Sequence, residues 1–184
     1  NVIKNIKRIR VDEIFIEKWV FWNLLLSVIS SIIVYKLSID LISMILSVYG
    51  MARIMEVIVY QINVLLFDPY RARIRGKKYS IKSPTRMVLL LLHNYVELIF
   101  WFSTIYIHLS TTAGINFGFN WSDYIRISAL CFTSNELSFI DYPGITRTIV
   151  NVAYAEMVGG LVMTIISLAR FIGLLPSVDT DDCI

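Results

Sequence analysis

Three apolar segments in the second half of the chain decide the fold, and the middle one is too short to cross a membrane. Residues 87–109 are MVLLLLHNYVELIFWFSTIYIHL, residues 124–132 are YIRISALCF, and residues 148–175 are TIVNVAYAEMVGGLVMTIISLARFIGLL. A bilayer core about 30 Å thick requires about 20 apolar residues in a helix. The order predicts a full span, a short re-entrant helix and a second full span. A surface helix in an extracellular loop is the alternative for the middle segment.

Two further spans are predicted in the first half of the chain. Residues 19–35 begin with the interfacial aromatics Trp19 and Trp22, and residues 41–67 follow after a short polar break. Together, residues 19–67 are expected to form a peripheral transmembrane helical hairpin. The chain has 184 residues, of which 57% are hydrophobic and only 17% charged. We therefore expect an all-α membrane protein with four transmembrane helices plus one re-entrant pore helix.

The distribution of charge predicts the orientation. Residues 68–86 contain seven Lys or Arg and the single acid Asp68, which indicates a basic cytoplasmic loop. Both termini then lie in the cytoplasm, and the protein is expected to be a multi-pass protein of the cell membrane. Residues 1–18 fit an amphipathic helix at the membrane surface, with an ordinary solvated helix as the alternative. Residues 176–184 form an acidic C-terminal tail.

Several classes of function are not expected. The net charge is +3, but the basic residues flank apolar segments instead of forming one aromatic-studded face, so no nucleic acid partner is expected. We find no HExxH motif, no nucleotide-binding glycine loop and no paired cysteine set, which argues against an enzyme, a cofactor and a metal site. Cys131 and Cys183 are expected to lie apart and not to form a disulfide.

Two segments carry a resemblance to a known family. Residues 121–133, WSDYIRISALCFT, start polar, carry an early aromatic and end in threonine. Residues 146–173 contain Glu156 shortly before the pair Gly159 and Gly160, and Leu-Ala-Arg near the end. These segments resemble the pore helix and inner helix of the tetrameric potassium-channel pore domain of the two-span, ion-transport type.

This resemblance covers residues 87–175. It implies a homotetramer arranged around the last span. It also implies that Glu156, Gly159 and Gly160 line the inner cavity or form a hinge. Close packing of a neighbouring helix is the alternative for the two glycines.

The selectivity filter departs from the family pattern, which is Thr-Val-Gly-Tyr-Gly. This chain keeps the threonine and lacks both glycines; the filter-like residues are Thr133, Ser134, Asn135, Glu136, Leu137 and Ser138. Glycine allows successive carbonyl groups to point toward one axis, so a standard potassium filter is not expected. Four copies of Glu136 would form a carboxylate ring that favours cations. The alternative is that Glu136 and Asp141 are only solvated loop acids.

Ionisable residues inside predicted spans are candidates for function because each is costly unless paired. Arg53 and Glu56 lie in the second predicted span, and Glu97 lies at a similar depth in the third. An Arg53–Glu97 or Arg53–Glu56 pair is therefore expected. We interpret this intramembrane polar network as a structural staple, because one arginine cannot supply the 3–4 gating charges of a voltage sensor.

The sequence as a whole predicts passive conduction of monovalent cations, K⁺ or Na⁺, with weak selectivity. The expected partners are further copies of the chain, membrane lipids and a separate regulatory protein. A non-conducting membrane scaffold or sensor that retains the channel architecture is the alternative, and an accessory subunit of a transporter is a third.

Overall fold

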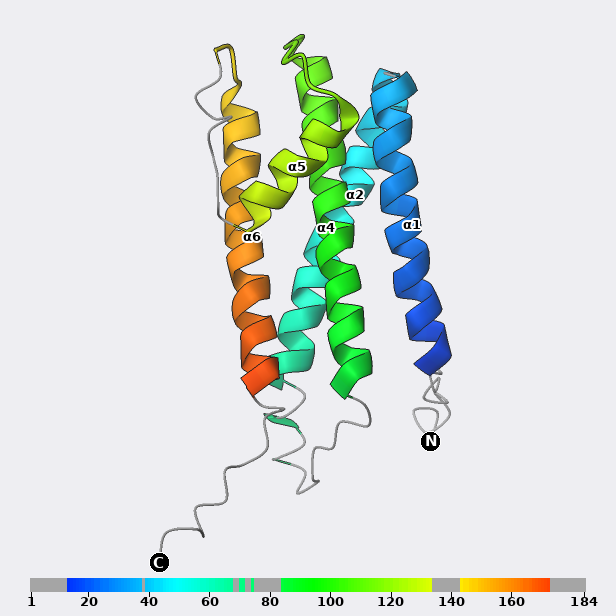
Figure 1. Ribbon diagram of the computed structural model, residues 1–184, viewed down its shortest axis with the longest axis vertical. Helices are drawn as coiled ribbons and strands as arrows, with labels where there is room; N and C mark the ends of the chain where they lie inside the picture. Colours follow the sequence, from blue (N-terminus) through cyan, green and yellow to red (C-terminus); the bar gives the residue numbers. More distant parts are fainter. Residues whose placement is uncertain are drawn as a thin grey trace, which may run out of the picture.

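The computed structural model describes residues 13–37, 39–67, 70–71, 74, 84–133 and 143–172, and most of them are helical. The elements are α1 (Glu13–Leu37), α2 (Asp40–Ile62), the π-helical turn η2 (Asn63–Phe67), α4 (Pro84–Thr112), α5 (Trp121–Phe132) and α6 (Arg147–Ile172). Four long helices run side by side, and α5 crosses obliquely between α4 and α6 (Figure 1). These residues contain no strand, which confirms the all-α prediction.

Four helices are long and apolar enough to cross a membrane. These segments are Lys18–Leu37, Asp40–Ile62, Val88–Thr112 and Arg147–Ala169. They match the four predicted spans, which supports a multi-pass membrane protein. One difference concerns residues 41–67, because the α-helix ends at Ile62 and the next five residues form the π turn η2.

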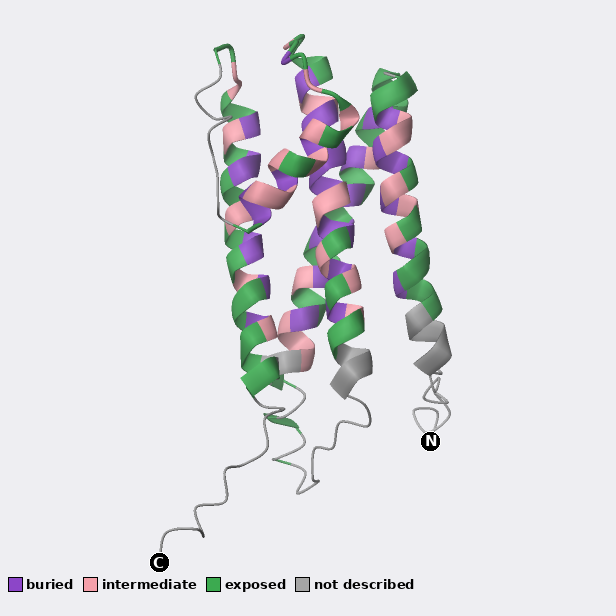
Figure 2. Ribbon diagram, in the orientation of Figure 1, coloured by how far each residue is buried: buried purple, intermediate pink, exposed green. Residues whose placement is uncertain are grey.

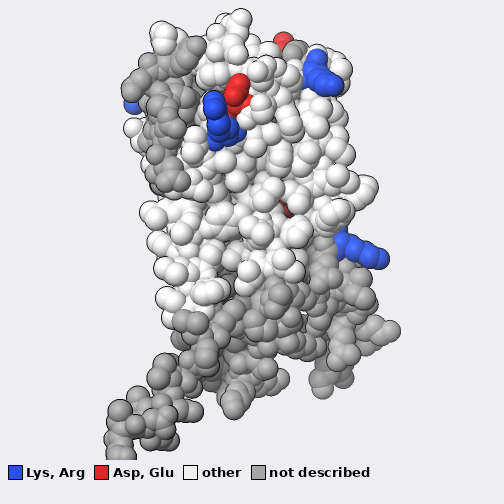
Figure 3. All heavy atoms as spheres, in the orientation of Figure 1, with Lys and Arg blue, Asp and Glu red and all other residues white. Residues whose placement is uncertain are grey.

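The outer surface of the long helices is apolar. Figure 2 shows exposed positions on every long helix, and large side chains such as Leu41, Val48 and Val158 are more than half exposed. Figure 3 shows one face on which most charged side chains lie toward the ends of the described bundle. Such a surface is suited to contact with lipid or with another membrane subunit, because neither environment exposes the apolar side chains to water.

Helix α4 is the centre of the bundle. Both α1 and α2 contact α4 more extensively than they contact each other. Trp101 of α4 is fully buried, and Gly50 of α2 makes room for it, because a Cβ at Gly50 would come within 2.7 Å of the Trp101 ring. The peripheral hairpin over residues 19–67 stays a prediction. The short connection makes α1 and α2 antiparallel, but each helix buries its inner face against α4.

Other predicted segments are described only in part. Residues 13–18 belong to α1 and continue directly into the first span, and the surface helix over residues 1–18 stays a prediction. Residues 1–12, most of the basic loop 68–86, residues 134–138 of the filter-like segment and the tail 176–184 lie outside the described residues.

Candidate functional site

Arg53 joins two carboxylates inside the bundle. Its Nε donates to Oε1 of Glu97 at 2.8 Å, and its Nη1 lies 2.8 Å from Oε2 of Glu56 one turn along α2. Trp101 Nε1 also donates to Oε1 of Glu97 at 3.3 Å. Both alternatives foreseen for the arginine are thus present together, and Arg53 links α2 to the central helix α4.

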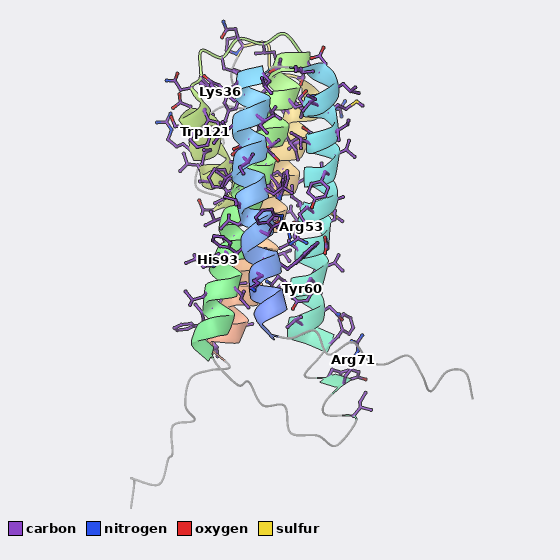
Figure 4. All side chains as sticks on the ribbon, turned by 90° about the vertical axis from the view of Figure 1, so that its right-hand side faces the viewer. Lys36, Arg53, Tyr60, Arg71, His93 and Trp121 are labelled. Carbon is purple, nitrogen blue, oxygen red and sulfur yellow. The ribbon has the colours of Figure 1, made fainter. Side chains whose placement is uncertain are left out.

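The arginine cluster lies between α1 and α2. Figure 4 shows Arg53 near mid-height of the bundle, well above Tyr60 and Arg71. The Arg53 guanidinium carbon lies 6.0 Å from the centre of the Trp19 ring of α1, a cation–π distance. Arg53 and Glu97 are buried, whereas the Glu56 side chain is 61% exposed. The cluster therefore fastens three helices, as expected of a staple.

A second polar cluster lies where α4, α5 and α6 meet. Glu156 of α6 is fully buried, and both of its carboxyl oxygens have hydroxyl partners. Tyr106 of α4 donates to Oε2 at 2.5 Å, and the Ser128 hydroxyl of α5 lies 2.5 Å from Oε1. The Cys131 side chain also interacts with Tyr106. One carboxyl group thus joins all three helices of the proposed channel-like module.

The two glycines of α6 are positions of close helix contact. A Cβ on Gly160 would overlap the carbonyl oxygen of Phe132, the last residue of α5. A Cβ on Gly159 would come within 3.3 Å of the end of the Ile58 side chain on α2. These contacts fit the close-packing alternative for the glycine pair.

The expectation that Glu156, Gly159 and Gly160 line a cavity is corrected, because all three are buried inside the chain. The exposed side of α6 carries other residues, which are Tyr154, Val158, Leu161, Ile165 and Leu168. A hinge at the glycines stays a prediction.

The short helix α5 has defined ends. Its start is a capping box, in which the Asn120 side chain accepts the backbone N–H of Asp123 and Asp123 accepts the N–H of Asn120 at 2.9 Å. Trp121 donates to Ser31 of α1 at 3.2 Å. At the other end, the Phe132 ring packs edge-on against Tyr95 at 5.2 Å. The filter-like residue Thr133 is the C-cap and donates to the carbonyl oxygen of Ala129 at 2.8 Å.

Sequence reasoning missed the partners of Glu156. Tyr106 and Ser128 are single polar residues in apolar helices, and nothing in their spacing distinguishes them from other buried hydroxyls. Their role depends on how α5 lies between α4 and α6, which periodicity does not report. Within the described part of the chain, no group of three His, Cys, Asp or Glu residues could hold a metal ion.

Comparison of the chain with family models, curated proteins and solved structures finds no match.

Proposed function

We propose that the chain is a subunit of a homotetrameric, potassium-channel-like membrane pore that passively conducts monovalent cations. In this proposal α4, α5 and α6 form the pore module, α5 is a re-entrant pore helix, and α1 and α2 lie at its periphery. The observation that best supports the proposal is the position of the end of α5, where the backbone of Phe132 contacts Gly160 in the middle of α6.

The depth of this contact supports a re-entrant helix. Gly160 is the fourteenth residue of α6, so it lies about 20 Å from the helix start at a rise of 1.5 Å per residue. The chain leaves α5 at the depth of Gly160, and the next helix, α6, begins at Arg147. A surface helix would end near the level of Arg147 instead. Non-helical backbone at membrane depth is tolerated where protein buries it or where it lines a water-filled cavity.

The exposed side of α6 supports assembly around this helix. Its residues are apolar, and they are not covered by the other described helices of the chain. In a four-fold arrangement this side would pack on neighbouring subunits or line an inner cavity. Glu156 has no part in that lining because it is buried within one subunit.

Selectivity in the proposed pore depends on side chains. Without the filter glycines, stacked carbonyl rings are difficult to form, so permeant cations keep part of their hydration shell. Glu136 is the acid of the filter-like segment, and four copies would attract cations. We therefore propose weak discrimination between Na⁺ and K⁺. The absence of these glycines also favours the second candidate, a non-conducting scaffold or sensor.

Reversal potentials of the reconstituted protein under bi-ionic conditions test this function. The proposal predicts a cation current with similar Na⁺ and K⁺ permeability, and loss of cation preference in Glu136→Gln. Asp141→Asn is the matched control, since it removes an acid outside the filter-like segment and is expected to leave selectivity unchanged. Strong K⁺ selectivity that survives Glu136→Gln contradicts the mechanism. Absence of current from a verified tetramer favours the scaffold or sensor.

A further inference from the structure

No Lys or Arg among the described residues pairs with the buried Glu156 carboxyl. Among the described residues, the ion pairs of the bundle join Arg53 to Glu56 and Glu97, and Arg126 to Asp123. In the described part of the chain, the titratable groups that face the Glu156 cluster are the Tyr106 hydroxyl and the Cys131 thiol, neither of which supplies positive charge. An ionised carboxylate in such a site is strongly unfavourable, and burial then favours the uncharged acid.

The hydrogen-bond count around Ser128 leads to the same assignment. The Ser128 oxygen lies 2.5 Å from Oε1 of Glu156 and 2.9 Å from the carbonyl oxygen of Ile99. A serine hydroxyl carries one hydrogen, so it donates to only one of these oxygens at a time. If Oε1 of Glu156 carries a proton, it donates to Ser128, and Ser128 donates onward to Ile99. All three short contacts of the cluster are then satisfied hydrogen bonds.

We propose that Glu156 is an uncharged carboxylic acid that positions α5 between α4 and α6. It donates to Ser128 of α5 and accepts from Tyr106 of α4, so one side chain of α6 fixes the short helix against both spans. Thr133 follows α5 directly, so Glu156 would also fix where the proposed constriction begins. That consequence rests on the proposed function, whereas the positioning of α5 does not.

The conservative variant Glu156→Gln tests whether the site requires an uncharged hydrogen-bond donor or a negative charge. In Glu156→Gln the amide nitrogen can donate to Ser128 while the amide oxygen accepts from Tyr106, so the arrangement of the cluster is retained. Glu156→Leu fills a similar volume but removes the hydrogen bonds of the carboxyl group to Ser128 and Tyr106. Ser128→Ala removes one partner with little change in volume and remains useful if the leucine variant fails to fold.

Two measurements on the full chain in lipid nanodiscs test the proposal. The first is infrared spectroscopy, in which the wild type is expected to show the carbonyl-stretch band of a protonated carboxylic acid. This band should vanish in Glu156→Gln and shift in Ser128→Ala. The second is the reaction rate of a water-soluble maleimide with the native Cys131, which is buried at the end of α5, in a Cys183→Ser background. The same background with Cys131→Ser reports any other reaction.

The expected labelling rate is unchanged in Glu156→Gln. It should rise roughly tenfold in Glu156→Leu or Ser128→Ala, because loss of a buried hydrogen bond shifts a local opening equilibrium by about that factor. A wild type without a Glu156-dependent band overturns the proposal, as does a glutamine variant that labels as fast as the leucine variant. Neither readout requires a current. A chain that shows the band and the labelling pattern but conducts nothing supports the positioning role and contradicts only the proposed function.

Discussion

Arg53 links two helices, because its carboxylate partners Glu56 and Glu97 lie on α2 and α4. Replacing it by leucine would leave Glu97 buried and without its cation. Loss of one partner of a buried ion pair costs about 3–5 kcal/mol, so Arg53→Leu should lower stability by that order. Unfolding in mixed micelles, followed by the change in helical circular dichroism, measures this loss.

A double-mutant cycle shows whether the two side chains are coupled. Adding Glu97→Gln to Arg53→Leu should recover part of the lost stability, because the stranded charge is removed. Arg126→Leu is the control, since Arg126 is exposed and its pair with Asp123 is worth at most about 1 kcal/mol. Strictly additive losses in the Arg53 and Glu97 variants would show that the contact carries no stability of its own.

The two polar clusters differ in how far the sequence predicts them. Arg53 and Glu97 could be paired in advance because both are ionisable, both lie in apolar helices, and their depths match. The Glu156 cluster could not, because hydroxyl groups occur throughout these helices and most bond to their own backbone. Ser27 and Ser31, for example, donate to backbone carbonyls three residues earlier.

The positions of the long helices were predictable from the sequence, but which helices pack against one another was not. Apolar runs of span length identify α1, α2, α4 and α6, and polar breaks set their ends to within a few residues. The runs do not specify which helix is central, since that depends on steric fit such as Trp101 against Gly50. For this reason the sequence predicts the short connection between α1 and α2, but not that both helices pack mainly on α4.

The contact between α5 and α6 gives a prediction with a built-in control. Gly160→Ala places a methyl group against the Phe132 backbone, so α5 must shift, at a cost of about 1–3 kcal/mol for overpacking. Gly159→Ala meets only the flexible end of Ile58, and alanine favours the helix, so stability should be unchanged or slightly higher. Thermal unfolding of the two variants in the same detergent makes the comparison. Equal unfolding temperatures of the two variants would show that α5 does not pack against Gly160 in the membrane.

For the whole molecule, the positive-inside rule gives a testable topology. Seven Lys or Arg residues between Asp68 and Arg86 predict that this loop lies in the cytoplasm and that Thr112, at the end of α4, lies on the opposite side. A cysteine at Ser80 should react only with reagent on the cytoplasmic side, and a cysteine at Thr112 only with reagent outside. Labelling of both from one side would mean that the four helices do not all cross.

The proposed function requires α5 and the segment after it to face the axis of a four-fold assembly. Electron cryomicroscopy of the protein in lipid nanodiscs tests this arrangement, since it reports the number of subunits and the view along the symmetry axis together. We expect a tetramer in which α6 lies innermost and residues 133–138 surround the axis. A monomer or dimer in which residues 133–138 face lipid would contradict it.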